Sequence, residues 1–183
     1  MLRSIIVLGI LASSGANASS EQHRFDVGYS YADISKDTSP QTQELNDVVT
    51  SHYSLSYQYQ LNKYLGLGVG YINGDSSRAD GLLIDIFTDS KVDYSAVLLS
   101  AQLSYPFAER HAGYVAIHAT QYDFDVFDDG KINVSDDGTD LGFAFGWQYN
   151  FDNGLGIRAG YEVVNLGEHI DIKGFTTGIN YRF

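Results

Sequence analysis

The end of the chain alternates between large apolar side chains and small or polar ones. From Phe175 to Phe183 the odd positions carry Phe, Thr, Ile, Tyr and Phe, and the even positions carry Thr, Gly, Asn and Arg. Because successive side chains of a β-strand point to opposite faces, this segment predicts a strand with one apolar and one polar face. One such strand could lie on any core, so its meaning depends on whether the pattern recurs.

The alternation recurs in seven further segments of about ten residues each. It is clearest at 139–151, where a leucine and five aromatic residues alternate with small or polar ones. At 113–124 it is imperfect, because Tyr122 and Phe124 share the face otherwise assigned to His118. The predicted strands are about 24–33, 51–61, 65–71, 92–105, 113–124, 139–151, 155–165 and 175–183.

An export signal precedes these strands. Arg3 provides a positive start, residues 5–12 form a short apolar stretch, and residues 16–18 (Ala-Asn-Ala) fit the cleavage pattern of signal peptides. The apolar stretch is too short for a membrane-spanning helix, which needs roughly 20 residues, and the cleavage pattern argues against an uncleaved anchor. We therefore predict a cleaved signal peptide at 1–18 and a single domain at 19–183. The chain contains no Cys, which excludes disulfides and thiolate metal sites.

The connections between the predicted strands alternate in length. Those after the second, fourth and sixth strands are short, and those after the first, third and fifth are long, acidic and rich in small polar residues. Bacterial outer-membrane barrels have short periplasmic turns and longer external loops, and an even number of strands places both termini in the periplasm. An open sheet edge is not viable in hydrocarbon, where each unpaired backbone group costs several kcal/mol. The sequence therefore predicts an all-β fold, a closed eight-stranded antiparallel up-and-down transmembrane β-barrel in a Gram-negative outer membrane.

A soluble eight-stranded barrel of the lipocalin type has the same periodicity but turns its apolar face inward. The polar face of this chain is rich in glycine, which suits a cramped interior better than a soluble outer surface. We therefore expect the apolar faces to contact lipid and the interior to be small and polar, filled by water or ion pairs.

Three segments near the end of the chain resemble a known family. Gly146–Phe151 (GWQYNF), Leu155–Tyr161 (LGIRAGY) and Gly178–Phe183 (GINYRF) resemble the small outer-membrane β-barrels that include OmpA-type membrane domains and the opacity-type adhesins. The resemblance implies an eight-stranded barrel, no shared enzymatic activity, and surrounding membrane lipid and lipopolysaccharide as partners. It also implies periplasmic chaperones and a carboxy-terminal signal read by the barrel-assembly machinery. The residues of that signal are Phe175, Ile179, Tyr181 and Phe183.

Charged residues fall on the predicted interior face of neighbouring strands. Buried charges persist when they are paired, so we expect Arg158 or Arg182 to pair with Glu162 or Asp26. The network can be a structural plug or a gate that opens when the pairs exchange, and the narrow bore of an eight-stranded barrel favours the plug. The predicted interior polar network comprises Arg24, Asp26, Arg158, Glu162 and Arg182.

Two other groups of residues are candidates for chemistry. His118 and Thr120 could share a face in a lipid-modifying hydrolase, but the serine nucleophile usual in such enzymes is missing beside them. The acidic stretch 123–140 offers oxygen ligands of the kind that Ca²⁺ prefers but lacks an EF-hand pattern, so a solvated loop is expected. We predict no catalytic residue, no cofactor and no metal site, and the 23 acidic against 11 basic residues argue against nucleic acid.

The sequence thus predicts a structural or surface-interaction protein that is not an enzyme. Its rigid, plugged barrel would display acidic external loops, for instance to lipopolysaccharide or to an adhesion partner whose identity the loops do not reveal. A narrow porin-like channel for small solutes or ions is the first alternative, and a lipid A-modifying enzyme is the second.

Overall fold

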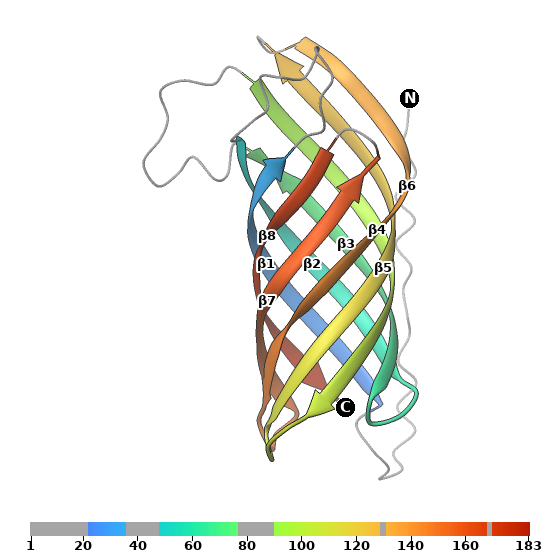
Figure 1. Cartoon of the computed structure of the whole chain (residues 1–183), viewed down its shortest axis with the longest axis vertical. Helices are drawn as coiled ribbons and strands as arrows, with labels where there is room; N and C mark the ends of the chain where they lie inside the picture. Colours follow the sequence, from blue (N-terminus) through green and yellow to red (C-terminus); the bar gives the residue numbers. More distant parts are fainter. Residues whose placement is uncertain (1–21, 36–47, 77–89, 129–130, 168–169) are drawn as a thin grey trace.

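The computed structural model describes residues 22–35, 48–76, 90–128, 131–167 and 170–183. Eight strands follow one another around a closed antiparallel barrel (Figure 1), which confirms the predicted fold class. The predicted signal peptide at 1–18 lies outside the described residues. The strands are β1 His23–Ser35, β2 Val48–Gln60, β3 Leu65–Asp75, β4 Ser90–Pro106, β5 His111–Asp128, β6 Lys131–Asn150, β7 Leu155–Leu166 and β8 Ile170–Arg182.

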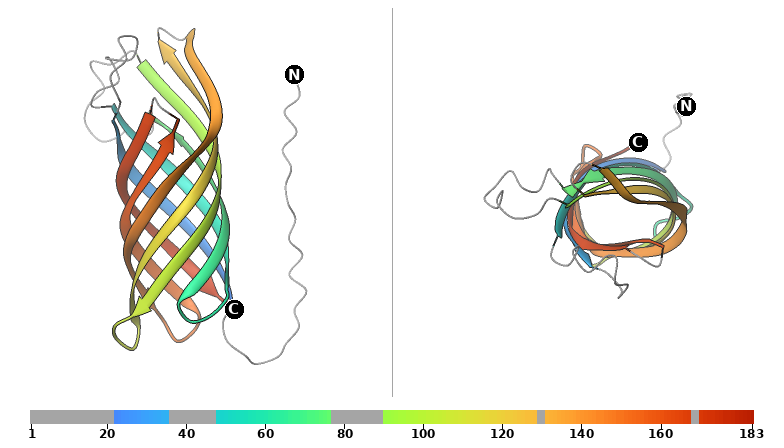
Figure 2. Two further views of the ribbon diagram at one scale, coloured as in Figure 1. Left: turned by 45° about the vertical axis from the view of Figure 1, so that its right-hand side comes forward. Right: turned by 90° about the horizontal axis from the view of Figure 1, so that it is seen from above.

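The barrel closes by pairing its first and last strands. β1 and β8 are antiparallel neighbours in an unbroken register from the pair Arg24–Arg182 to the pair Ser35–Asp171. Seen along its axis, the wall forms a complete ring (Figure 2, right). The polar backbone groups of both edge strands are therefore satisfied within the sheet, as hydrocarbon requires.

Large apolar side chains cover the outside of the barrel through most of its height. Leu99 is 65% exposed and Ile117 is 68% exposed, whereas His118, the residue after Ile117, is only 5% exposed. This orientation is opposite to that of a lipocalin-type barrel. In the described part of the chain, no helix is long and apolar enough to cross a membrane.

The polarity of the wall inverts near its long-connection end. On β5 the outward residues change from Val115 and Ile117 to Asp123, while the inward residues change from His118 to Phe124. Inward and outward positions keep alternating along β5. Tyr122 and Phe124, which seemed to break the pattern, therefore face the interior. The same change occurs on β4 and β8, where Asp93 and Lys173 point outward and apolar residues point inward.

The inversion corrects the expectation of a uniformly polar interior. At the long-connection end the barrel encloses an apolar cluster, because the wall there is polar outside and must bury its other face like a soluble protein. We call it the apolar cap; it comprises Ala32, Ile34, Ile72, Val92, Tyr94, Ala96, Tyr122, Phe124, Val126, Val164, Leu166, Ile170 and Ile172.

The acidic stretch 123–140 is also not the loop that the sequence analysis predicted. β5 and β6 pair continuously up to Asp128 and Lys131, with one register shift between Val126 and Phe127. The resulting hairpin rises above the rest of the wall (Figure 2, left). It forms because the even positions of β5 are apolar and pack into the cap. The other two predicted long loops, 36–47 and 77–89, lie outside the described residues.

Interior tyrosines lie over glycines of neighbouring strands. A Cβ atom built on Gly146 would lie 2.8 Å from the hydroxyl oxygen of Tyr114, and one built on Gly74 would lie 2.6 Å from that of Tyr94. Both glycines are therefore needed for close approach. The many interior glycines make room for a few large side chains, which fill the bore.

Candidate functional site

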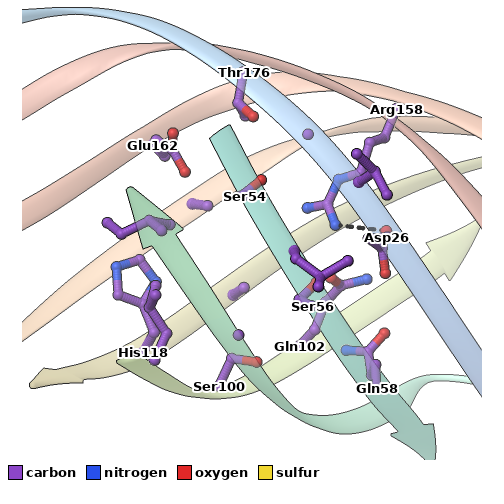
Figure 3. A pocket seen from close by; sticks show the side chains of 18 of the residues that line it. Asp26, Ser54, Ser56, Gln58, Ser100, Gln102, His118, Arg158, Glu162 and Thr176 are labelled. Atoms are coloured by element: carbon purple, nitrogen blue, oxygen red, sulfur yellow. Dashed lines mark hydrogen bonds and ion pairs between the residues drawn. The ribbon is translucent and has the colours of Figure 1, made fainter. Parts of the chain in front are cut away.

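A layer of paired charges crosses the lower half of the barrel interior, which is the half nearer the short turns. The Nε of Arg24 donates to Asp26 Oδ2 at 2.9 Å, and the Nη1 of Arg158 donates to Asp26 Oδ1 at 3.1 Å. Two guanidinium groups thus share one carboxylate, and Figure 3 shows its contact with Arg158. Arg158 reaches across from β7 to β1 because Gly178 of the intervening β8 and Gly28 stand beside it in register.

Amide and aromatic groups complete this layer. Arg24 is 2% exposed, and it donates from Nη1 to Gln148 Oε1 at 3.2 Å and from Nη2 to Gln102 Oε1 at 3.0 Å. The guanidinium of Arg158 lies over the ring of Tyr114, with 4.4 Å from its Cζ atom to the ring centroid. Contacts from β1, β4, β5, β6 and β7 therefore meet at one level, which we call the arginine layer.

A second polar layer lies nearer the apolar cap. Glu162 accepts a hydrogen bond from the hydroxyl of Ser30, and His52 Nε2 lies 2.9 Å from its Oε1. The other ring nitrogen of His52, Nδ1, is 2.8 Å from the Tyr94 hydroxyl. Glu162 thus contacts a histidine where the sequence predicts an arginine, because β2 and β7 lie on either side of the β8–β1 pair.

A small cavity separates the two layers. Its volume is about 110 Å³, and hydroxyl, imidazole and carboxylate groups face it (Figure 3). Its polar lining suits ordered water. Side chains on its wall include Ser54, Ser56, Ser100, His118, Glu162 and Thr176.

The sequence as a whole matches a known family model. Residues 4–183 match the model described as the outer membrane protein beta-barrel domain. The chain belongs to this family. Membership of the family places the protein in the outer membrane.

Solved structures that share the fold include the following three. Neisserial surface protein A superposes with a TM-score of 0.71 at 15% identity, covering 90% of this chain and 98% of that one. Ail, the attachment invasion locus protein of Yersinia pestis, gives 0.58 at 18% identity, covering 88% and 97%. The N-terminal β-barrel domain of Pseudomonas aeruginosa OprF gives 0.53 at 13% identity, covering 86% and 97%. No curated protein sequence is significantly similar to the outer-membrane barrel.

Arg182 lies apart from the other predicted network residues. It is at the short-turn end of the outer-membrane barrel, where its Nη2 donates to the backbone oxygen of Phe151 at 3.2 Å. The structure brings Arg24, Asp26 and Arg158 together. His52 and Gln148 lie on the polar faces of their strands, but only the arrangement of neighbouring strands shows that they join the site.

The residues proposed as the assembly signal lie on the lipid-facing side of β8. Phe175, Ile179, Tyr181 and Phe183 are all exposed. The ring of Phe183 stacks on His23, with centroids 5.4 Å apart, which fixes the end of the chain against β1. These side chains are accessible from the membrane, and their recognition by the assembly machinery remains a prediction.

The structure supports neither a hydrolase pair nor a metal site among the described residues. His118 and Thr120 both point into the interior of the outer-membrane barrel, and within the described residues neither His118 Nε2 nor Thr120 Oγ1 makes a hydrogen bond. They therefore do not form a nucleophile–base pair. Across the ranges that the structure describes, no group of three or more His, Asp or Glu side chains is arranged to hold a metal ion.

Proposed function

We propose that this protein is a rigid scaffold of the outer membrane that presents the β5–β6 hairpin to a partner outside the cell. The observation that carries the proposal is the inversion of the wall. The lower barrel is built for lipid and the upper barrel for water, so the hairpin stands clear of the membrane. The short turns and both termini then face the periplasm, in keeping with the even strand number.

The hairpin offers two features for recognition. Its outward face is acidic: Asp123 and Asp137 are register partners, and Asp125 faces Asp93 of β4. Its far edge is also open among the described strands: the register between β6 and β7 begins only at Phe143, so within the described residues the earlier part of β6 has a strand partner on one side alone. An acidic surface favours a basic protein partner, and an accessible strand edge can pair with an extended segment.

The filled interior supports a scaffold over a transporter. The arginine layer, the His52–Glu162 layer and the apolar cap follow one another along the axis. An eight-stranded barrel has a bore only wide enough for side chains. The other partners we propose are lipopolysaccharide around the upper wall, and the chaperones and assembly machinery that deliver the chain. The filled centre of the barrel contains no nucleophile–base pair among the described residues, and we propose that the protein is not an enzyme.

Adherence measurements test the scaffold function. Cells that produce the protein should bind to immobilised basic host proteins, such as histones, better than cells without it. The triple variant Asp123→Asn, Asp125→Asn, Asp137→Asn should reduce binding about tenfold or more, the effect of losing several charge contacts. Asp152→Asn at a short turn is the matched control. Equal adherence of the triple variant and the unchanged protein would contradict the proposal.

A narrow channel is the second candidate, and one observation favours it. A cavity opens on each side of the arginine layer, and Arg24 lines both. If Arg24 exchanged its ion-pair partner, the two cavities would join, although the apolar cap would still close the outer end of the barrel. Planar-bilayer recording separates the candidates: the scaffold predicts no conductance steps from pure protein, and reproducible steps would establish the channel.

A further inference from the structure

The barrel has a vestibule at its short-turn end. It is a cavity of about 410 Å³ with Arg24 as its floor, on the opposite side of the arginine layer from the central cavity. Cavities of about 300–1,000 Å³ are the size that holds small organic ligands. Its lining residues include Arg24, Gln60, Asn62, Lys63, Ser104, Gln148, Asn150 and Arg182.

The charge of the vestibule is opposite to that of the protein. The whole chain has 23 acidic and 11 basic residues. Among the described residues that line the vestibule, three are basic (Arg24, Lys63 and Arg182) and none is Asp or Glu. Asp26, the carboxylate of the arginine layer, pairs with Arg24 and lines the central cavity, not the vestibule. The local field therefore attracts anions.

Arg24 also orients the amides that line the walls. A guanidinium group has only donors, so Gln148 and Gln102 turn their side-chain oxygens toward it. Their NH₂ groups then point toward the mouth, where Gln148 donates to Asn150 Oδ1 at 3.5 Å and Gln102 donates to Ser104 Oγ at 2.8 Å. Since Asn150 and Ser104 accept these bonds, the amide NH₂ of Asn150 and the hydroxyl proton of Ser104 are left for the vestibule.

Asn62 at the rim is arranged in the same way. Its Oδ1 accepts hydrogen bonds from the backbone N–H groups of Tyr64 and Leu65, both at 2.9 Å. Its NH₂ group is therefore left as a donor. Gln60 is the exception on the wall, since its Nε2 donates to Gln58 at 3.0 Å and its oxygen is left. Asn62, Ser104 and Asn150 thus each present a donor to the cavity.

We propose that the vestibule binds a small solute through a phosphate or carboxylate group. Lys63 and Arg182 bring positive charge to the wall; the Nζ of Lys63 lies 4.7 Å from the centroid of the Tyr64 ring at the rim. Asn62, Ser104 and Asn150 donate to the anion oxygens. Charged acceptors make shorter and stronger hydrogen bonds than neutral ones, so an anion fits this set of donors better than a neutral polyol. With the orientation of the proposed function, the site faces the periplasm.

Side-chain amide resonances report on this binding directly. The full mature chain, ¹⁵N-labelled and held in a neutral maltoside micelle, is titrated with glycerol 3-phosphate and, as a neutral match, with glycerol. The resonances of Asn62 and Asn150 should shift saturably with glycerol 3-phosphate and not with glycerol. Lys63→Gln and Asn150→Asp should each weaken binding about tenfold, the effect of one charge-assisted hydrogen bond.

A second arm identifies the source of the phosphate. In nanodiscs without added solute, resonances already shifted in phosphatidylglycerol but not in phosphatidylcholine would assign the site to a lipid headgroup. Unshifted resonances in both lipids, together with the micelle result, assign it to a free solute.

The control is Arg110→Gln, at the next short turn. Arg110 is exposed, pairs with Asp152 and does not line the cavity, so this variant should bind as the unchanged protein does. Equal shifts with glycerol, or an equal loss of binding in Arg110→Gln and Lys63→Gln, would overturn the site. The adherence measurement on the hairpin is independent of this titration, so either proposal can fail alone.

Discussion

The lower and upper parts of the barrel share one continuous wall, but the lower wall faces lipid and the upper wall faces water. Below, Ile117 points into lipid while His118 points into a polar bore; above, Asp125 points into water while Phe124 points into an apolar core. The strands keep the same alternation throughout, so only the chemistry of the two faces is exchanged. The single strand β5 therefore has the side-chain pattern of a membrane strand at one end and of a soluble strand at the other.

The two parts also differ in how they are held together. The lower interior depends on a few specific contacts to charged groups, in which removing one partner leaves another charge buried. The upper interior depends on apolar burial, which is less specific and is spread over the thirteen residues of the apolar cap. We expect the lower part to respond sharply to single polar substitutions and the upper part to respond to losses of volume.

The largest effect should come from Asp26→Ala. The substitution leaves Arg24 and Arg158 without their shared carboxylate, and breaking a buried ion pair costs about 3–5 kcal/mol. Urea unfolding from lipid vesicles, followed by Trp147 fluorescence, measures the free energy of unfolding. A loss below about 1 kcal/mol would show that the arginine layer is solvated like an exposed pair. Asp152→Asn, in the exposed pair with Arg110, is the control and should change nothing measurable.

Next in size is Phe124→Ala in the apolar cap. Phe124 is 1% exposed, and a core Phe→Ala substitution costs about 3–5 kcal/mol. Because the cap lies at one end, protease cleavage should increase in the upper hairpin while the lower wall stays protected. Gln121→Ala, an exposed position of the same strand, is the control. Uniform loss of protection along the whole barrel would mean that the two parts do not melt separately.

The smallest effects are expected from two substitutions to Arg on the outer face, and their difference locates the height at which the wall leaves the lipid. Leu99→Arg places a charge on the outer face of the lower wall, where it should cost about 2–3 kcal/mol in a bilayer. Gln121→Arg places the same charge on the outer face of β5 just before Asp123, and should cost close to nothing. The comparison is made by unfolding both variants from vesicles. Equal costs at the two positions would show that the membrane extends higher than the inversion indicates.

Much of the fold was predictable because each strand of a β-barrel shows a local alternation of apolar and polar side chains. The eight strands, the closure of β1 on β8 and the outward apolar face all follow from side-chain parity and from the cost of open edges in lipid. Tyr122 and Phe124 were the residues on which the prediction was incomplete. Their parity was right, but a uniform membrane pattern gave no reason for aromatic residues inside.

The interior site was predictable only in part. Alternation places Arg24, Asp26, Arg158 and Glu162 inside the barrel, but it does not specify which of them meet. That depends on the tilt and stagger of the strands and on which glycines let a side chain cross a neighbouring strand. Arg158 reaches Asp26 past Gly178, whereas Glu162 sits at the level of His52.

The sequence by itself determined the number of strands, their facing and the closed membrane barrel, because each of these follows from side-chain periodicity along a single strand. The tertiary structure alone decided the partners inside the bore, the height at which the wall leaves the lipid, and the hairpin in place of an acidic loop. Those features depend on distances between strands far apart in the chain, which alternation along one strand does not encode.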